Sequence, residues 1–403
     1  MSVSLSSSNL NPRHILVRGT NWLGDAVMTT PALLRLREKF PDAQIVLLCA
    51  EKLRDLWFHH PAVDETIAFA PGESVFSVAK TLRRWGERSR EPKRTDGRSQ
   101  GSSREGARPA GFEFALVLPN SPRSALEVFL AGIPQRIGGA RPWRNFFLTQ
   151  AVAPRPDAVK MRKRTPQEIQ RLVAGENGST GNRQPATGNA LAHQIHEYLH
   201  LVAALGANPE PLAPQLMVTP EEVAAVKGEF GLERIVQPVF GLNPGAEYGP
   251  AKRWPAEKFI AAAREIQQRT GCLWLIFGGK GDAAVTAQIQ SAIGSRQSAV
   301  NLAGQTSLRE LMALLKLCRV MLTNDTGPMH VAAALGTPVV APFGSTSPEL
   351  TGPGLPGDPR HRLLQSDAPC APCFLRECPV DFRCMNGISV QQAVQAVVEA
   401  WQH

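Results

Sequence analysis

Short apolar runs rich in β-branched residues alternate with stretches of helical periodicity along most of the chain. Strand-like runs cover residues 14–18, 44–49, 66–69 and 114–118 in the first half, and 239–242, 273–277, 320–322 and 339–340 in the second. Helical periodicity covers residues 26–39, 75–85, 125–131, 195–205, 256–269 and 308–317. Strands joined by helical crossovers pair in parallel, so the pattern predicts an α/β fold.

The length of the chain predicts two domains. Its 403 residues exceed the size at which a single hydrophobic core keeps growing. A proline-rich stretch at residues 207–220 suits an interdomain linker, so we expect domains at 1–212 and 213–403. Two polar segments without apolar periodicity, at about 86–111 and 176–189, are interpreted as flexible insertions in the first domain.

The clearest single unit is a strand, turn, helix and strand at residues 320–340. Asp325 and Thr326 stand in the turn after the first strand, and the helix begins at Gly327 and Pro328. Parallel sheets bind ligands at this edge, and the free N–H groups of a helix start favour an anion. The alternative is that Asp325 or Thr326 only caps the helix.

Two further loops in the second half also follow strands. One begins at Asn243 and Gly245 and carries Lys252, and the other begins at Gly278. A diphosphate needs backbone N–H donors and positive charge, so these residues join Thr326 and Gly327 as candidate nucleotide ligands. Lys252 as a solvated surface residue is the alternative.

Two side chains near these loops have competing interpretations. His330 lies three residues after Gly327, and either contacts the substrate or is a buried histidine bonded to backbone. Trp254 is expected in the core rather than as a stacking surface.

The first half offers a carboxylate in a similar position. Residues 19–25 form a glycine-containing loop after a strand, but the G-x-G-x-x-G spacing of a dinucleotide fingerprint is missing. Asp25 ends this loop, as a candidate general base or as a helix cap. Ser121 and Arg123 follow another strand. They could contact a substrate or only turn the chain, and the turn is the favoured interpretation.

The net charge of +9 is concentrated in two segments. Residues 80–110 hold ten Lys/Arg against four Asp/Glu, and residues 160–171 hold five against one. The rest of the chain is about neutral, so a nucleic-acid face is poorly supported. These segments are expected to be solvated, and attraction to an anionic membrane surface or a phosphorylated acceptor is the alternative.

Seven cysteines bear on compartment and metal binding. The N-terminus lacks the basic and apolar regions of a secretory signal, which favours the cytoplasm and reduced thiols. Four cysteines lie within fifteen positions: Cys370, Cys373, Cys378 and Cys384. They predict either a structural zinc site or a packed thiol cluster. A catalytic thiol is disfavoured because the sequence shows no base nearby.

Three motifs resemble one family. Gly24-Asp25 after the first strand, the stretch at 243–255 (NPGAEYGPAKRWP) and the stretch at 323–335 (TNDTGPMHVAAAL) are similar to lipopolysaccharide heptosyltransferases of glycosyltransferase family 9. The segments LPNS at 118–121 and AGIP at 131–134 extend the resemblance, and the cysteine-rich segment is similar to one found in a subset of these enzymes.

This resemblance implies a GT-B fold, with two Rossmann-like domains facing across a cleft and a last helix, at about 390–401, crossing back to the first domain. It implies Asp25 as the general base, Lys252 on the donor phosphates, Asp325 as a donor-site carboxylate, and Thr326 with Gly327 at the phosphates. No cofactor for catalysis is implied beyond a possible structural zinc.

The implied reaction is inverting transfer of heptose from ADP-heptose to the heptose I residue of the lipopolysaccharide inner core. It implies a cytoplasmic enzyme at the inner face of the inner membrane, with a lipid A–core acceptor and no nucleic acid. The alternatives are a sibling transferase for heptose I, heptose III or another sugar, a GT-B nucleotide-sugar epimerase, and a non-catalytic, zinc-bearing interaction protein.

Overall fold

The structure is a computed structural model that describes residues 11–88, 111–159, 161–175, 190–295 and 297–402. The chain divides into two compact units. The first comprises residues 1–21, 32–156 and 197–210, and the second comprises 22–31, 157–196 and 211–403. Residues 22–31 and 157–196 therefore belong with the second unit, whereas a single boundary at 212/213 was predicted.

The first unit is built on a six-stranded parallel sheet of order β3-β2-β1-β4-β5-β6. Its strands are β1 (His14–Arg18), β2 (Gln44–Ala50), β3 (Glu65–Phe69), β4 (Phe114–Val117), β5 (Gln135–Gly139) and β6 (Gln150–Val152). Its helices are α2 (Thr30–Lys39), α3 (Val75–Arg88), α4 (Pro122–Leu130) and α6 (Ile195–Ala203), with short 3-10 turns η2 (Glu51–Trp57) and η3 (Asn145–Phe147).

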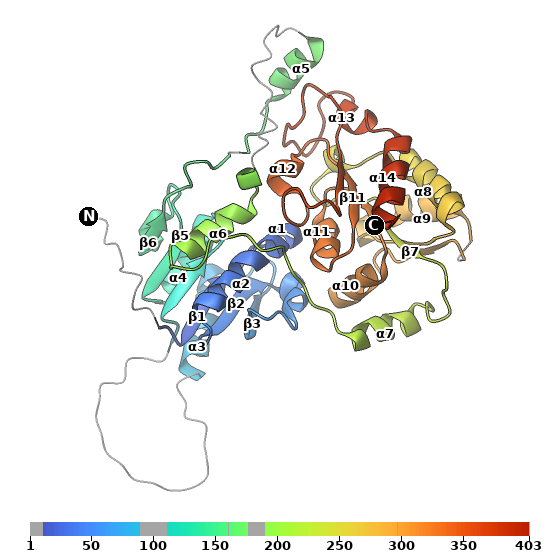
Figure 1. Cartoon of the computed structure of the whole chain (residues 1–403). Helices are drawn as coiled ribbons and strands as arrows, with labels where there is room; N and C mark the ends of the chain where they lie inside the picture. Colours follow the sequence, from blue (N-terminus) through green and yellow to red (C-terminus); the bar gives the residue numbers. More distant parts are fainter. Residues whose placement is uncertain (1–10, 89–110, 160, 176–189, 296, 403) are drawn as a thin grey trace, which may run out of the picture. The chain divides into compact units, whose positions relative to one another are not determined.

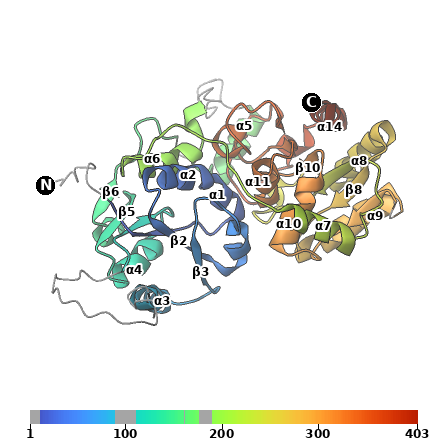
Figure 2. The ribbon, with the colours of Figure 1, turned by 60° about the horizontal axis from the view of Figure 1, so that its bottom comes forward.

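Helices cover both faces of this sheet, as its apolar strands require. Leu16, Val46 and Val117 point to one face and share a core with Val78 of α3 and Val128 of α4. Figure 2 shows α3 and α4 on that side of the sheet and α2 with α6 on the other. This arrangement leaves the loops after the strands as the open edge of the unit.

The second unit repeats the same plan, with strand order β12-β11-β10-β7-β8-β9 and parallel pairing throughout. Its strands are β7 (Val239–Asn243), β8 (Leu273–Ile276), β9 (Ala299–Asn301), β10 (Met321–Thr323), β11 (Val339–Pro342) and β12 (Arg362–Leu364). Its main helices are α1 (Leu23–Met28), α7 (Pro220–Glu229), α8 (Ala256–Thr270), α9 (Ala283–Ile293), α10 (Leu308–Leu317), α11 (Gly327–Ala334) and α14 (Val390–Gln402). Shorter elements are α5 (Pro166–Ala174), η5 (Ala190–Ala192), η6 (Pro250–Lys252), η7 (Lys280–Asp282), α12 (Pro348–Thr351) and α13 (Arg383–Asn386).

The C-terminal helix packs on the second sheet. Val394 and Val397 of α14 share a core with Phe259 of α8 and Val340 of β11, and Figure 1 shows α14 beside α8. The extensive contacts of this helix among the described residues are with α8, β11 and β12. The apolar face of α14 is therefore buried within the second unit.

Most predicted elements are present, and one is divided. The helix predicted over 26–39 is two helices, α1 and α2, separated at Thr29. Pro31 has no N–H to continue the hydrogen-bond ladder, and the Thr29 and Thr30 hydroxyls donate to the carbonyls of Ala26 and Val27 instead. The capping box predicted at Ser307 and Glu310 is formed.

Two further observations concern the polar insertions and the membrane. Of the first predicted insertion, residues 86–88 continue α3 and 89–110 lie outside the described residues, as does all of 176–189. Within the described part of the chain, no helix combines the length and apolar composition of a membrane-spanning segment.

Candidate functional site

The site lies where the second sheet changes its winding direction. Strands β7 and β10 are neighbours in the sheet but not in sequence, and their last residues, Asn243 and Thr323, are paired. Loops after two such strands diverge and leave a crevice at the carboxyl edge. The Asn243 amide donates to the hydroxyls of Thr323 (3.1 Å) and Thr326 (3.2 Å), so it fixes the entry to α11.

A second amide joins the same loops. Asn324 donates to the Pro244 carbonyl (2.7 Å) and accepts from the Trp254 backbone N–H (2.9 Å). Trp254 itself is buried, with its ring nitrogen donating to the Ile388 carbonyl, so the prediction of a core tryptophan is confirmed. The segment that carries Lys252 is therefore tied to the end of β10 on both sides.

Lys252 and Asp325 form the charged centre of the site. Lys252 Nζ lies 2.6 Å from Asp325 Oδ2, and the Asp325 side chain is only 4% exposed. The Thr346 hydroxyl donates to the same carboxylate oxygen at 2.5 Å. Lys252 is thus held in place as an ion pair rather than left as a solvated surface residue, and its ammonium group has further donors to offer a ligand.

Asp25 of α1 belongs to the same compact unit as this ion pair. Partial burial raises the pKa of its carboxyl to about 6, opposed by the positive charge of Lys252 and a hydrogen bond from the Gln194 side chain. The charge of Asp325 adds a smaller upward effect on the same pKa. The pKa of Asp25 therefore lies close to neutral pH, and the positive charge of Lys252 acts on its carboxylate. This is the electrostatic setting of a general base.

Helices α1 and α11 cross closely next to these charges (Figure 1). A Cβ atom at Gly24 would lie 2.7 Å from His330 Cδ2, and one at Gly327 would lie 2.8 Å from Leu23 Cβ. Each glycine therefore admits the partner helix, which is a packing reason for both residues beside any role in ligand binding. His330 is buried in this crossing, and burial lowers its pKa to about 4, so it is neutral at physiological pH.

The helix α11 begins without a side-chain cap from its N-cap residue. Thr326 is the N-cap residue, yet its side chain makes no capping hydrogen bond. Asp325 is engaged with Lys252 and Thr346. The first N–H groups of α11 are thus not capped by the Thr326 side chain, contrary to the alternative in which that residue serves only as a cap.

The glycines of the other two loops gather around Asp282. A Cβ at Gly245 would lie 2.3 Å from Asp282 Oδ2, and a Cβ at Gly278 would lie 3.0 Å from Asp282 Cβ. Asp282 also accepts a hydrogen bond from the Gly279 N–H. Gly245 and Gly278 thus have a structural role in letting these two loops meet.

The cysteine-rich segment packs against the loop that carries Lys252. Tyr248 donates its hydroxyl to the Phe374 carbonyl (2.9 Å), and Lys252 Nζ and the Arg376 guanidinium lie 5.0 and 5.1 Å from the centre of its ring. The Ala251 N–H donates to the Arg376 carbonyl. A Cβ at Gly249 would lie 2.5 Å from that same carbonyl oxygen, so the two segments pack at backbone contact.

The four clustered cysteines were expected to form either a structural zinc site or a packed thiol cluster. Within the described residues, no three His, Cys, Asp or Glu side chains are grouped as a metal site, and all seven cysteines are free thiols. Cys370 and Cys373 pack instead in an apolar cluster with Ile169, and Cys384 is buried in the main core of the unit. Cys370, Cys373 and Cys384 thus fill apolar space, as the packed-thiol interpretation expects. Cys378 is half-exposed, and its sulfur accepts a hydrogen bond from the Phe382 N–H.

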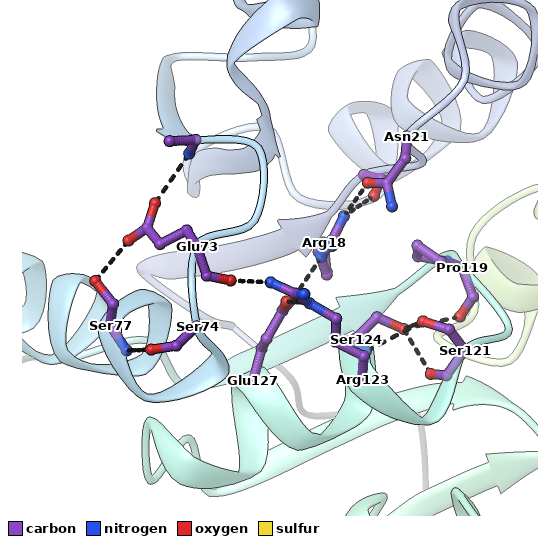
Figure 3. A network of polar contacts seen from close by, with 12 residues as sticks. Arg18, Asn21, Glu73, Ser74, Ser77, Pro119, Ser121, Arg123, Ser124 and Glu127 are labelled. Atoms are coloured by element: carbon purple, nitrogen blue, oxygen red, sulfur yellow. Dashed lines mark hydrogen bonds and ion pairs between the residues drawn. The ribbon is translucent and has the colours of Figure 1, made fainter.

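Candidate residues in the first unit serve its local structure. Ser121 is the N-cap of α4, and Arg123 pairs with Glu127 four residues later. Figure 3 shows that Glu127 also accepts from the buried Arg18, which in turn donates to Asn21. The turn interpretation of Ser121 and Arg123 therefore agrees with their contacts, and the buried Arg18–Glu127 pair fixes the end of β1.

The sequence profile of glycosyltransferase family 9 (heptosyltransferase) matches residues 104–382, which is more than half of the chain. The chain belongs to glycosyltransferase family 9. Lipopolysaccharide heptosyltransferase 2 of Salmonella typhimurium is 32% identical over 342 residues, covering 84% of this chain and 85% of that protein. The corresponding Escherichia coli protein is 31% identical with the same coverage. The predicted family and glycosyltransferase class are confirmed.

Solved structures of family 9 members share the fold. The E. coli ADP-heptose LPS heptosyltransferase II superposes with a TM-score of 0.70 at 26% identity, covering 96% of this chain and 98% of that one. A family 9 glycosyl transferase from Veillonella parvula gives a TM-score of 0.74 at 20% identity, with 98% of each chain covered. With two parallel six-stranded sheets in this chain, the predicted GT-B class of two Rossmann-like domains is confirmed.

Sequence reasoning missed the residues that complete the site through contacts distant in sequence. Gln194 and Thr346 bond to the two carboxylates, and Arg376 shares the ring of Tyr248 with Lys252. Gln194 and Arg376 do not stand in a turn after a strand, whereas Thr346 lies in the glycine-containing loop after β11 and was overlooked. The only available signal for Arg376 was the family likeness of the cysteine-rich segment, which gives it no role.

Proposed function

We propose that this chain is an inverting heptosyltransferase that moves L-glycero-D-manno-heptose from ADP-heptose to the heptose I residue of the lipopolysaccharide inner core. The observation that carries the proposal is the grouping of Asp25, Lys252 and Asp325 at the start of α11, within a family 9 chain. The names of the relatives from Salmonella and E. coli support the donor and the second-heptose specificity.

In this reaction the acceptor hydroxyl oxygen attacks C1 of the heptose and the bond from C1 to the ADP oxygen breaks. The hydroxyl proton passes to the Asp25 carboxylate, and ADP leaves with the bonding electron pair. A carboxylate with a pKa of about 6 is largely ionised at physiological pH and remains basic enough to accept a proton as the new bond forms. Asp25 is therefore assigned as the general base.

Negative charge develops on the departing diphosphate, and Lys252 with the N–H groups of Thr326 and Gly327 would stabilise it. Lys252 is preorganised by Asp325, so little reorganisation is needed when the phosphates bind. The helix dipole of α11 acts in the same direction. Asn243 and His330 would act as positioning residues, because they hold the start of α11 and its crossing with α1. The contacts that Gly245 and Gly278 make with Asp282 would set the shape of the nucleotide loops.

The partners follow from the same reaction. The donor would be ADP-heptose and the acceptor a lipid A–core oligosaccharide, with no role for nucleic acid. A lipid-linked acceptor requires the enzyme to work at the cytoplasmic face of the inner membrane, as a peripheral protein. The basic composition of the chain, at net +9, is compatible with an anionic membrane surface.

The donor assignment is tested by calorimetry with ADP and ADP-heptose. Lys252→Ala should weaken binding of both ligands by at least about tenfold, because a partly buried charge-assisted contact is lost. Lys227→Ala is the matched control, since this exposed lysine lies on α7 of the same unit. Unchanged affinity of Lys252→Ala would remove Lys252 from the nucleotide site.

The base assignment is tested by steady-state turnover on purified inner-core acceptor. Asp25→Ala should lower kcat by at least about a hundredfold while ADP-heptose affinity stays nearly the same. Asp42→Ala, at an exposed turn, is the control. Near-normal turnover of Asp25→Ala would exclude it as the base. Conversion of the nucleotide sugar without acceptor would instead indicate an epimerase.

A further inference from the structure

An exposed group of aromatic and arginine side chains lies at the β6 side of the first sheet. We define the aromatic–arginine patch as Phe129, Arg136, Arg141, Trp143 and Phe146. Trp143 is 90% exposed, Phe146 81% and Phe129 37%. Large apolar side chains exposed together mark an interaction surface more often than a chance feature of a monomer.

Ring contacts join the phenylalanines of the patch into one surface. The rings of Phe129 and Phe146 lie 6.2 Å apart, and both contact Phe147 at 5.5 and 5.6 Å. The Arg136 guanidinium lies over the Phe129 ring at 5.3 Å. The patch therefore combines α4, β5 and the η3 loop rather than a single flexible side chain.

The loop that carries Trp143 is held in a fixed conformation. Arg144 is buried beneath it and donates to the Pro119 carbonyl at 2.8 Å, and the Arg141 N–H donates to the Asn145 side chain at 2.9 Å. Trp143 has a φ of 65°, a left-handed conformation that is costly for a bulky residue. The fold thus maintains a strained turn whose result is an outward-facing indole.

Charge identifies the kind of partner. Between Glu127 and Asp157 the chain contains four arginines and no acidic residue: Arg136, Arg141, Arg144 and Arg155. Glu127 itself is buried and paired with Arg18 and Arg123, so its charge is compensated. Arg83 of α3 donates to the Leu130 carbonyl and brings another cation to the end of α4. Arg155 is paired with Glu197 and Arg144 is buried, so Arg136 and Arg141 are the arginines of this stretch that belong to the patch, and their side chains bond to backbone carbonyls. Aromatic side chains beside these two arginines complement a surface with apolar depth and anionic head groups.

We propose that the aromatic–arginine patch docks the enzyme on an anionic phospholipid bilayer. Trp143 and Phe146 enter the interface between head groups and acyl chains, while Arg141 and its neighbours contact lipid phosphates. The inference rests on the proposed function only in that a lipid-linked acceptor gives membrane docking its purpose.

The test is vesicle flotation of the full chain without substrates. The protein should bind vesicles that contain phosphatidylglycerol, bind phosphatidylcholine vesicles much more weakly, and dissociate as salt is raised. The double substitution Trp143→Ala with Phe146→Ala should lower the partition constant by at least about tenfold, because both interfacial anchors are lost. Arg141→Gln should reduce the salt-sensitive part of the partition constant by about threefold to fivefold.

Phe58→Ala is the matched control. Phe58 is a half-exposed aromatic residue that follows η2, which contacts β2 and β3 at the opposite end of the sheet order. Its loss should leave flotation unchanged, and circular dichroism should show all variants folded. Absence of wild-type binding to anionic vesicles, equal binding by the double variant, or equal loss in Phe58→Ala would each overturn the proposal. Loss of self-association in the double variant without a change in flotation would assign the patch to a second copy instead.

A transferase assay separates this proposal from the proposed function. The double variant should act normally on a soluble core oligosaccharide and poorly on acceptor embedded in vesicles. Normal heptosyl transfer with unaffected flotation would overturn the patch alone. Flotation as expected without any heptosyl transfer would overturn the function and leave the patch supported.

Discussion

At the scale of single residues, the site contains two carboxylates, Asp325 and Asp25, whose surroundings differ. Asp325 is almost fully buried but bonded to Lys252 and Thr346, whereas Asp25 has the weaker support of Gln194 and a more distant cation. Two carboxylates near one lysine can therefore take different roles, with one orienting the cation and the other exchanging a proton.

The raised pKa of Asp25 predicts the pH dependence of the reaction. A general base works as the carboxylate, so kcat/KM should rise with pH through about 6 and level off above it. With an ordinary aspartate the rise would lie near the usual value of 3.8. The measurement is kcat/KM for a soluble acceptor across the acid range at constant ionic strength, with binding of ADP followed in parallel.

Two results would contradict this prediction. A kcat/KM that stays constant from acid pH to neutrality would exclude titration of the base. A parallel change in ADP affinity would show that the rise in kcat/KM reflects donor binding instead. Asp25→Asn supplies the control, because its residual rate should show no limb near pH 6. Glu38→Gln, at an exposed position of α2, should keep the wild-type profile.

Residue types and their local order were enough to identify the polar centre of the site but not its full set of contacts. Asp25, Lys252 and Asp325 each follow a strand, and the carboxyl edge of a parallel sheet is where such residues meet. Gln194 could not be found this way, because it precedes α6 and follows no strand. Thr346 does follow β11, but its contact with Asp325 depends on how this loop folds back. The sequence left a zinc site and a packed thiol cluster as alternatives, because cysteine spacing does not distinguish metal ligands from buried apolar thiols.

At the scale of elements, the crossing of α1 and α11 links packing to the site. Gly24 lies in α1 directly before Asp25, and Gly327 is the first residue of α11, two residues after Asp325. The missing Cβ atoms let the two backbones approach, which brings both carboxylates to one place. The sequence indicated a helix at each position, but not that the two would cross, since helix contacts between distant segments leave no periodic signal.

A methyl group at this crossing should destabilise the protein. Gly24→Ala and Gly327→Ala would each force contacts under 3 Å, with His330 and Leu23 respectively, and should lower the free energy of unfolding by about 1–3 kcal/mol. Denaturant unfolding measures this, and Gly281→Ala is the control because a Cβ there would meet nothing within 4 Å.

A double-mutant cycle makes the same prediction specific to the crossing. Combining Gly24→Ala with His330→Ala should cost less than the sum of the single changes, since the smaller side chain makes room for the methyl group. Strict additivity, or a loss from Gly281→Ala as large as from Gly24→Ala, would show that the crossing is not the constraint.

At the scale of the whole molecule, the two sheets have equivalent strand orders but different open edges. The switch point of the second sheet gathers Asn243, Lys252 and Asp325, whereas the first sheet places the Arg18–Glu127 pair at the end of β1. The pattern of apolar runs predicted four strands of each sheet, because buried parallel strands are nearly continuous in apolar residues. It missed β5, β6, β9 and β12, which lack such runs or are only three residues long. It did not predict that residues 22–31 and 157–196 would belong with the second unit, since unit membership is decided by contacts and not by chain order.

This division predicts where ADP should slow backbone hydrogen exchange. If the diphosphate binds Lys252 and the start of α11, peptides covering 243–253 and 323–331 should be protected by about tenfold or more at saturation. Peptides covering 22–31 should be protected with them, because α1 packs on α11, while β2 and β4 of the first sheet should be unchanged. Lys252→Ala should abolish the protection at both regions together. Protection confined to the first sheet, or to 243–253 without α1, would mean that α1 does not share the stability of the nucleotide site and that Asp25 reaches the sugar by another route.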